Sequence, residues 1–280
     1  MTYLGVTSET PRLLRPADMP GLLRLKDAAA WNQTAGDWRR VLALEPEGCF
    51  GIDCDGTLAA TATVVCYGTD LAWIGMVLTL PEFRGRGLAR KLMEHSIAYC
   101  ERRGVQWAKL DATDMGAPIY AKLGFESECA VERRLREPGP IFANGAIGPG
   151  EPDLRLDRRA FGADRSALLR ELAAEGGAAI PGEAFAMGRP GSRAAFFGPS
   201  VSRSAESARR LLEWYLAAHP REPVFWDLLP ENKAATDLAN EFGFAPVRRL
   251  ARMGRRIAPA AAPFECDNSL VFGIAGFEFG

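Results

Sequence analysis

Apolar and polar positions change period repeatedly along the chain, so the sequence predicts a mixture of helices and strands. Apolar residues that return every three or four positions are typical of amphipathic helices, and short apolar or alternating runs closed by Gly or Pro are typical of strands. In the first half we expect helices at 17–30, 37–44, 87–103 and 115–122. We expect strands at 11–16, 71–80, 106–111 and 126–136.

A hairpin is predicted within residues 48–68. Two β-rich runs, GCFGID and TLAATATVVCY, meet at Cys54-Asp55-Gly56. Asp-Gly between such runs is a strong signal for a two-residue hairpin turn. Together with the elements above, this order indicates an α/β fold with a mixed (α+β) sheet flanked by helices.

A break in the pattern divides the chain. Residues 137–150 (EPGPIFANGAIGPG) contain four Gly and three Pro, too many for a regular element. We therefore predict a first domain at 1–138, a linker at 139–150 and a second domain at 151–280. In the second domain we expect helices at 164–175, 205–218 and 232–242, and strands at 193–199 and 223–229.

The two halves resemble each other. A strand and a helix lead to YAKLGF at 120–125 in the first half and to ANEFGF at 239–244 in the second, and a β run follows each. Aligned on the Gly-Phe pair, Asp111 falls close to the position of Asp227. Two related domains in tandem account for this most simply, although a helix, a Gly cap and a strand can also recur by chance.

Composition narrows the classes of partner. The 280 residues include 48% hydrophobic residues and a net charge of −1, so no basic field favours nucleic acid or an anionic membrane. Six cysteines form no C-x-x-C pair and the two histidines lie far from them, which predicts no metal site. The start lacks a secretory pattern, and no run of eighteen apolar residues exists. We expect free thiols, the reducing cytoplasm and a small-molecule or peptide partner.

The segment most suggestive of chemistry is LTLPEFRGRGLAR, residues 78–90, where a strand passes through a Gly-rich turn into a long helix. The first N–H groups of a helix have no intrahelical acceptor and carry the positive end of its dipole. Gly85 and Gly87 keep side chains away from this end, while Arg84, Arg86 and Arg90 add positive charge. The segment predicts a cradle for a pyrophosphate. It is neither a Walker loop nor a full dinucleotide fingerprint.

Two motifs at this spacing resemble the GNAT superfamily of acyltransferases. Arg84-x-x-Gly87-x-Ala89 matches the family's pyrophosphate loop, with Pro81 upstream, and residues 120–125 match its Y-x-K-x-G-F block. The resemblance covers roughly residues 9–137 and implies tandem domains, each a mixed, mostly antiparallel twisted sheet flanked by helices.

The resemblance also implies a cofactor and its site. Acetyl-CoA (coenzyme A) would lay its pantetheine arm along the backbone of the fourth strand and its pyrophosphate on the amides of the loop. For Arg86 and Arg90, a solvated helix face is an equally good interpretation. The residues expected to bind the cofactor are Val77, Leu78, Thr79, Arg84, Gly85, Arg86, Gly87, Leu88, Ala89 and Arg90.

Catalysis would need a general acid and a base. Tyr120 matches the family tyrosine that protonates the leaving thiolate, although it could also be a core residue of an amphipathic helix. The base stays undecided, because none of the nearby acids lies in a deciding pattern and many family members use only a water chain. These acids are Asp70, Glu82, Asp111 and Asp114.

The acceptor would meet the first two helices of the first domain. Trp31 and Trp38 could wall a pocket, and Asn32, Gln33 and Asp111 could hold polar groups of the acceptor. The alternative is that the segment is structural, with Thr34 or Asp37 capping the second helix and Trp38 in the core.

The second domain departs from the family pattern. The segment GPSVSRSA at 198–205 lacks the pyrophosphate motif, and Ala239 stands where Tyr120 stood. We therefore expect a degenerate cofactor site and a role in completing the acceptor pocket. Asp227 and Asn232 in DLLPEN fit turn or cap positions better than an acceptor site. A further hypothesis places a terminal carboxylate at Gly280 in the active site, as in some tandem GNAT aminoglycoside acetyltransferases.

The sequence thus favours an enzyme that acetylates a primary amine of a small molecule by direct transfer, with Tyr120 as general acid. The alternatives are an acyl-CoA sensor without turnover and a protein or peptide N-acetyltransferase. The expected state is a monomer or homodimer.

Overall fold

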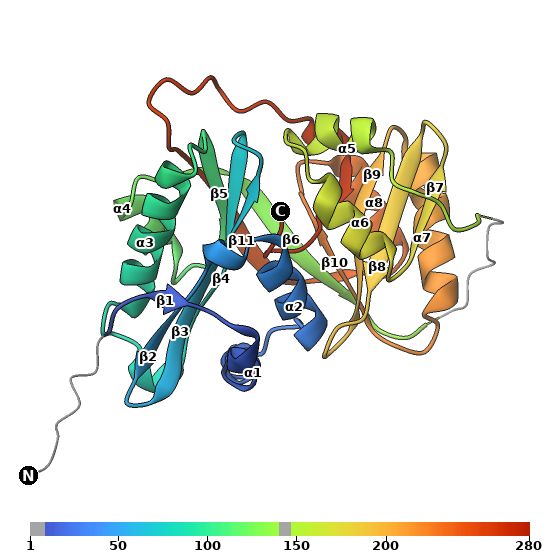
Figure 1. Ribbon diagram of the computed structural model, residues 1–280. Helices are drawn as coiled ribbons and strands as arrows, with labels where there is room; N and C mark the ends of the chain where they lie inside the picture. The colour runs from blue at the N-terminus through green and yellow to red at the C-terminus, as the bar shows by residue number, and fades with distance from the viewer. Residues whose placement is uncertain (1–8, 140–146) are drawn as a thin grey trace, which may run out of the picture.

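The computed structural model describes residues 9–139 and 147–280, which form one α/β body (Figure 1). Every helix and strand expected in the first half is present, with ends shifted by a few residues. Its helices are α1 (Met19–Ala28), α2 (Ala35–Leu44), α3 (Leu88–Arg102) and α4 (Ala117–Lys122). Its strands are β1 (Arg12–Leu13), β2 (Cys49–Cys54), β3 (Thr57–Tyr67), β4 (Leu71–Thr79), β5 (Trp107–Ala112) and β6 (Glu126–Arg136).

The second half repeats this plan and adds elements that the sequence patterns did not predict: α5, β7, β8 and β12. Its helices are α5 (Leu154–Phe161), α6 (Ser166–Ala173), α7 (Ala205–Ala218) and α8 (Lys233–Glu241). Its strands are β7 (Gly177–Ile180), β8 (Ala184–Arg189), β9 (Ala195–Ser202), β10 (Val224–Leu228), β11 (Ala245–Arg256) and β12 (Val271–Gly273).

The predicted hairpin between β2 and β3 is confirmed. Cys54 pairs with Thr57, and the two turn residues have positive φ, 51° at Asp55 and 74° at Gly56. A two-residue turn with both central residues at positive φ matches the twist of the strands that it joins.

Within residues 9–139 and 147–280, the strands form one sheet of twelve, in the order β1-β2-β3-β4-β5-β11-β6-β10-β9-β8-β7, with β12 beside β9. The strand that follows the repeated Gly-Phe pair is exchanged between the halves: β11 lies between β5 and β6, and β6 lies between β11 and β10. The two halves therefore meet through backbone hydrogen bonds as well as side chains. Most of the predicted linker, residues 140–146, lies outside the described residues, and its far end pairs Pro149 with Ala178 of β7.

A pseudo-twofold axis passes between β6 and β11. Val131 and Leu250 face each other across these strands, and both lie seven positions after the Gly of the repeated Gly-Phe pair. Two buried carboxylate–arginine pairs are related by this axis, Asp111 with Arg252 and Asp227 with Arg133. Each pair joins strands of different halves, so the exchanged strands fix the halves together.

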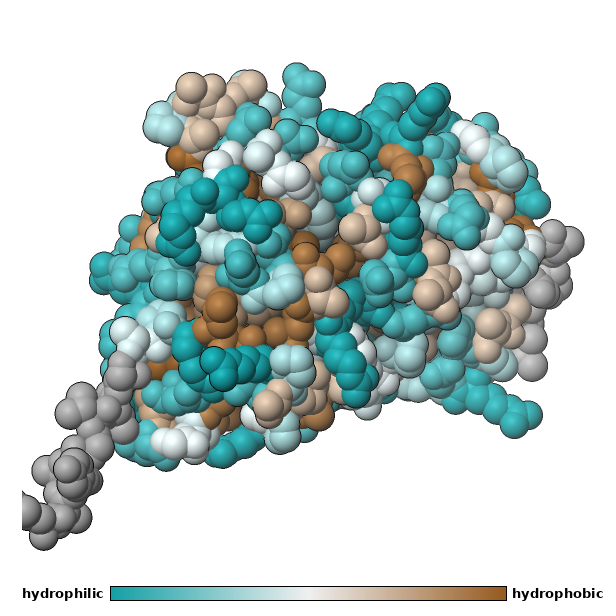
Figure 2. Space-filling model, viewed as in Figure 1, coloured by the Kyte–Doolittle hydropathy of each residue, from teal (hydrophilic) through white to brown (hydrophobic). Residues whose placement is uncertain are grey.

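Helices cover both faces of the sheet (Figure 1). In the first half, α3 packs on β2, β3 and β4 from one face, while α1 packs on β3 and β4 from the other. One core lies under α3 and another runs under α1 and α2 across the centre of the molecule to α5 and α6. Figure 2 shows apolar surface gathered around α1 and α2. No helix among residues 9–139 and 147–280 is long and apolar enough to cross a membrane.

Candidate functional site

The first half opens where β4 and β5 separate. These parallel strands pair at Leu71–Trp73 with Trp107–Lys109, and both then run on beyond the pairing. Beyond the split, β4 is irregular: Met76 has φ 48° and its carbonyl accepts a hydrogen bond from Thr61 Oγ1 at 2.9 Å. A pocket of about 460 Å³, counting its mouth, lies at this split. We call it the β4–β5 pocket, and it is lined by Trp31, Ile74, Gly75, Met76, Val77, Leu110, Asp111, Thr113, Tyr120, Arg248, Leu250 and Phe277.

Tyr120 on α4 reaches this pocket from the α3 side of the sheet. Its ring lies against Gly116, where an added Cβ would come within 3.1 Å of the Tyr120 hydroxyl oxygen. Desolvation by burial raises the pKa of Tyr120 to about 12. The phenol therefore keeps its proton at neutral pH and can act as a donor inside the pocket.

The Gly-rich turn before α3 has the expected geometry of an anion cradle. Gly85 and Gly87 have φ of 79° and 77°, and a Cβ at either position would meet nothing within 4 Å. No side chain caps the helix, whose first intrahelical bond runs from the Lys91 N–H to the Gly87 carbonyl. The N–H groups of Leu88, Ala89 and Arg90 therefore remain available to an anion, and this end of α3 fits a pyrophosphate.

The arginines around this turn already have partners. Arg84 donates to the Thr79 carbonyl, Arg86 is paired with Glu9, and Arg90 is paired with Glu94 one helical turn later. Exposed pairs of this kind contribute little and can open toward a ligand. The backbone of the turn is thus the better-formed part of the cradle.

The expected pantetheine strand lies beside the pocket. Val77 lines the pocket, while Leu78 and Thr79 pair with Thr61 and Ala60 of β3. The other edge of this stretch of β4 faces the split from β5. The buried hydroxyl of Thr79 meets no hydrogen-bond partner among the described residues.

The acceptor-side residues are divided between two places. Trp31 lines the β4–β5 pocket, as expected for a pocket wall. Asn32 instead accepts from the backbone N–H groups of Arg193 and Ala194 and donates to the Ala194 carbonyl. Gln33 donates to Glu278 at 2.8 Å. Neither side chain lines the β4–β5 pocket, because both hold the second half against the first.

Two other polar candidates, Asp111 and Asn232, make structural hydrogen bonds. Asp111 lines the pocket but accepts two hydrogen bonds from Arg252, at 2.9 and 3.0 Å. Burial raises the pKa of Asp111, and the arginine opposes that shift. In the second half, Asn232 caps α8 by accepting from the Ala235 N–H, which agrees with the cap interpretation.

Trp38 is a core residue, since its side chain on α2 is fully buried. Thr34 and Asp37 share the capping of α2: Thr34 accepts from the N–H groups of Gly36 and Asp37, and Asp37 accepts from the Thr34 N–H. A Thr-x-x-Asp sequence forms this reciprocal capping box at the start of a helix. Among the remaining acids considered as a general base, Glu82 pairs with Arg24 at the surface.

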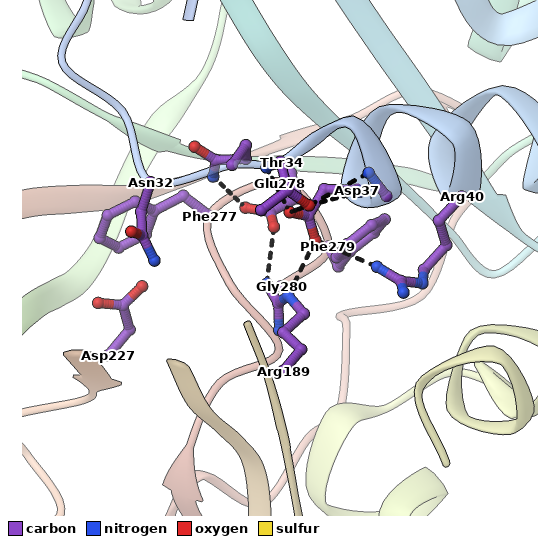
Figure 3. A network of polar contacts seen from close by, with 12 residues as sticks. Asn32, Thr34, Asp37, Arg40, Arg189, Asp227, Phe277, Glu278, Phe279 and Gly280 are labelled. Carbon is purple, nitrogen blue, oxygen red and sulfur yellow. Dashed lines mark hydrogen bonds and ion pairs between the residues drawn. The ribbon is translucent and has the colours of Figure 1, made fainter. Parts of the chain in front are cut away.

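A segment near the end of the chain completes the site. Phe277 lines the β4–β5 pocket, and the backbone of Glu278 lies so close to Gly75 that a Cβ there would come within 2.9 Å of it. The Glu278 carboxylate accepts hydrogen bonds from Gln33 and Arg189, and Arg189 also donates to Asp37. Figure 3 shows Glu278, Arg189 and Asp37 together in this network. Burial raises the pKa of Glu278. This segment belongs to the second half, yet Phe277 forms part of the wall of the β4–β5 pocket in the first half.

The final residue lies elsewhere. The Gly280 carbonyl oxygen accepts from Arg165 and from the Ala275 N–H, and Gly280 packs against Trp73 and Phe161. It is not among the residues that line the β4–β5 pocket. The hypothesis that a carboxylate at Gly280 enters the site with Tyr120 finds no support in this arrangement.

The corresponding split in the second half is filled. There β9 and β10 pair at Ala195–Phe197 with Val224–Trp226 and then separate, and β12 pairs with β9 just beyond that point. The Trp226 indole donates to the Phe272 carbonyl and the Ile274 N–H donates to the Asp227 carbonyl, so both sides of the split are bridged. Strand β9 runs on to Ser202, three residues beyond the expected end of the strand at 193–199, so the junction with α7 lies at Arg203 and Ser204, within the segment 198–205.

Sequence patterns missed the residues that the second half contributes to the pocket: Arg248, Leu250 and Phe277. None stands in a recognisable motif, because the exchanged strand β11 brings the first two to the first half and the segment after β12 brings Phe277. The repeated Gly-Phe pair was the signal that could have found β11, since it marks the strand equivalent to β6.

Comparisons with known proteins agree with this architecture. Residues 19–125 match the model of the acetyltransferase (GNAT) family, and residues 154–272 match a second model described as acetyltransferase (GNAT) domain. An uncharacterized N-acetyltransferase of Bacillus subtilis, YitH, is 26% identical over 249 residues, which are 82% of this chain and 86% of that protein. Holothin acyltransferase of a Pseudoalteromonas species is 25% identical over 151 residues, 51% of this chain and 50% of that protein.

Solved structures show the same fold. A protein of Pyrococcus horikoshii superposes with a TM-score of 0.84 at 20% identity, covering 100% of this chain and 99% of its own. A tandem GNAT protein from the clavulanic acid biosynthesis pathway superposes with a TM-score of 0.61 at 16% identity, covering 90% of this chain and 99% of its own.

Proposed function

The chain belongs to the GNAT family and carries two acetyltransferase domains in tandem, and on this premise we propose that it acetylates a primary amine of a small molecule with acetyl-CoA, using Tyr120 as general acid. The observation that carries the proposal is the contrast between the two splits. The split of β4 from β5 is open and holds a tyrosine, whereas the split of β9 from β10 is filled by β12. We therefore expect each chain to bind one acetyl-CoA, in the first half.

Each part of the first half has a role in this proposal. The backbone at Val77–Thr79 would hold the pantetheine arm, and the N–H groups at the start of α3 would hold the pyrophosphate. Acetyl-CoA supplies an acetyl thioester when bound. Tyr120 Oη would hold the proton that the departing sulfur needs, and its raised pKa keeps that proton in place until then.

The acceptor is proposed to be small because the second half closes the site. Phe277 and Leu250 of the second half line the same pocket as Trp31 and Tyr120. A protein N-terminus would need an open groove leading to the β4–β5 pocket, and Phe277 and Leu250 of the second half occupy that space. The chain offers Asp111 as the nearest acid in the pocket, but its pair with Arg252 favours a water-mediated route for the amine proton.

Calorimetric titration with acetyl-CoA tests the cofactor site. Gly87→Glu places a side chain and a negative charge at the open N-terminus of α3, and we expect binding to be lost. Gly104→Glu is the matched control, because Gly104 also has positive φ, 66°, and open space, but lies at the other end of the same helix. Both variants carry the same backbone strain and the same added charge.

The outcomes separate the proposal from its alternatives. Loss of binding in Gly87→Glu alone supports the site, whereas equal loss in both variants, or no binding by the wild type, refutes it. Release of free CoA with a panel of small amines then distinguishes an enzyme from a sensor. Binding without turnover on any amine of the panel would favour the sensor.

A further inference from the structure

Six side chains form two parallel rows across one face of the sheet centre. The first row is Asp111 on β5, Arg252 on β11 and Cys129 on β6, since each residue faces the next across the strands. The second row is Asp227 on β10, Arg133 on β6 and Arg248 on β11. The pseudo-twofold axis exchanges the rows, so Cys129 and Arg248 are equivalent positions.

The two rows differ by one positive charge. In the first row, Arg252 donates twice to Asp111, at 2.9 and 3.0 Å, and a neutral cysteine follows. In the second row, Arg133 donates twice to Asp227, at 2.7 Å each, and a second arginine follows. The second row thus contains two guanidinium groups and one carboxylate, which is paired with Arg133, and the row carries a net charge of +1.

Arg248 is the cation left without a partner. Among the described residues its guanidinium makes no hydrogen bond or ion pair, although it is half-buried and lines the β4–β5 pocket. Burial lowers the pKa of Arg248, and the neighbouring Arg133 lowers it further while Asp227 opposes the shift. A desolvated cation without a counter-ion is unfavourable, and an anion in the pocket would relieve it.

Local strand geometry aims this side chain at the pocket. The register of β11 against β6 shifts between Pro246 and Arg248, which leaves Val247 as the extra residue of a bulge. The alternation that follows puts Arg248 on the same face as Leu250, another lining residue. Bulges commonly redirect a side chain at the edge of a functional site.

We propose that Arg248 binds a carboxylate group of the acceptor, so that the substrate is an amine that also carries a carboxylate, such as an amino acid. The inference rests on the proposed function and specifies its substrate class. A single planar guanidinium matches a carboxylate through two parallel hydrogen bonds. The one surplus charge of the row matches a monoanion, whereas a phosphate dianion would be left half neutralised.

Matched pairs of acceptors test the proposal in the full chain. Glycine, β-alanine and 4-aminobutyrate are compared with glycinamide, β-alaninamide and 4-aminobutyramide by CoA release. We expect the wild type to prefer the carboxylates, and Arg248→Gln to lower the carboxylate-to-amide ratio of kcat/KM by about tenfold to a hundredfold. Arg248→Lys should restore part of the ratio. The control is Arg249→Gln, an exposed neighbour on the opposite face of the strand.

A second readout does not depend on turnover. Thermal unfolding is compared in sodium acetate and sodium chloride at equal ionic strength. We expect acetate to raise the Tm of the wild type and of Arg249→Gln, but not that of Arg248→Gln. An acetate effect that survives in Arg248→Gln, or its absence from the wild type, overturns the carboxylate assignment.

The outcomes keep the two proposals apart. Acetyl-CoA binding and turnover of uncharged amines, with no Arg248-dependent preference for carboxylates, refute the substrate class and leave the acetyltransferase proposal intact. Arg248-dependent stabilisation by acetate in a protein that does not bind acetyl-CoA supports an anion site and refutes the cofactor proposal.

Discussion

The two carboxylates related by the pseudo-twofold axis should contribute unequally to stability. Asp111 and Asp227 have fully buried side chains, and each accepts two hydrogen bonds from one arginine on a neighbouring strand. The substitutions Asp111→Asn and Asp227→Asn remove the same charge from equivalent places. Only the row of Asp227 contains a second arginine, Arg248, on the far side of Arg133, so we expect Asp227→Asn to be the more destabilising.

The magnitude follows from the row of charges. Removing one partner of a buried pair leaves an uncompensated cation and costs about 3–5 kcal/mol. Asp227→Asn in addition removes the attraction between Asp227 and Arg248, which in the wild type offsets the repulsion between Arg133 and Arg248. Taking roughly 8–10 Å between two unit charges and an effective dielectric constant of about 20, the lost attraction amounts to about 2 kcal/mol. We therefore expect the two variants to differ by about 2 kcal/mol.

Urea unfolding followed by circular dichroism measures this difference, provided that the slopes of the transitions agree. The double variant Asp227→Asn with Arg248→Gln should recover about 2 kcal/mol relative to Asp227→Asn alone, because it removes the repulsion. Equal destabilisation by Asp111→Asn and Asp227→Asn, or no recovery in the double variant, would refute the claim that Arg248 is a surplus charge in this row.

Two further outcomes are expected. Tyr120→Phe should lower kcat by about a hundredfold or more while acetyl-CoA affinity, measured by calorimetry, stays unchanged. The pKa of Tyr120 is raised to about 12, so its ionisation should not lower the kcat of the wild type on the alkaline side until the pH nears that value; a decline near pH 10 that Tyr120→Phe abolishes would contradict this role. Residues 1–138 expressed alone lack β11 and leave β5 and β6 without their shared partner, so we expect aggregates in size-exclusion chromatography. A monomeric fragment with native far-ultraviolet circular dichroism would show that the exchanged strand is dispensable.

The sequence by itself determined the local elements and the cofactor motif. The turn at Asp55-Gly56, the helix that starts after Gly87 and the repeated Gly-Phe pair all depend on residues close together in the chain. Such features are encoded by φ preferences, capping and hydrophobic period, which need no tertiary partner. The same local signals predicted β6 at 126–136 without error in its ends.

Only the tertiary structure decided which half supplies which wall of the site. Strands β6 and β11 have the same kind of sequence, so the local sequence does not distinguish pairing of each strand within its own half from the observed pairing with the other half. The observed pairing brings Arg248 and Leu250 into a pocket more than a hundred residues from Tyr120 in the chain. The filling of the second split by β12 likewise depends on where residues 271–273 pack, because three residues have no periodicity of their own. Long-range pairing and packing determine these features, and no local pattern in the sequence records them.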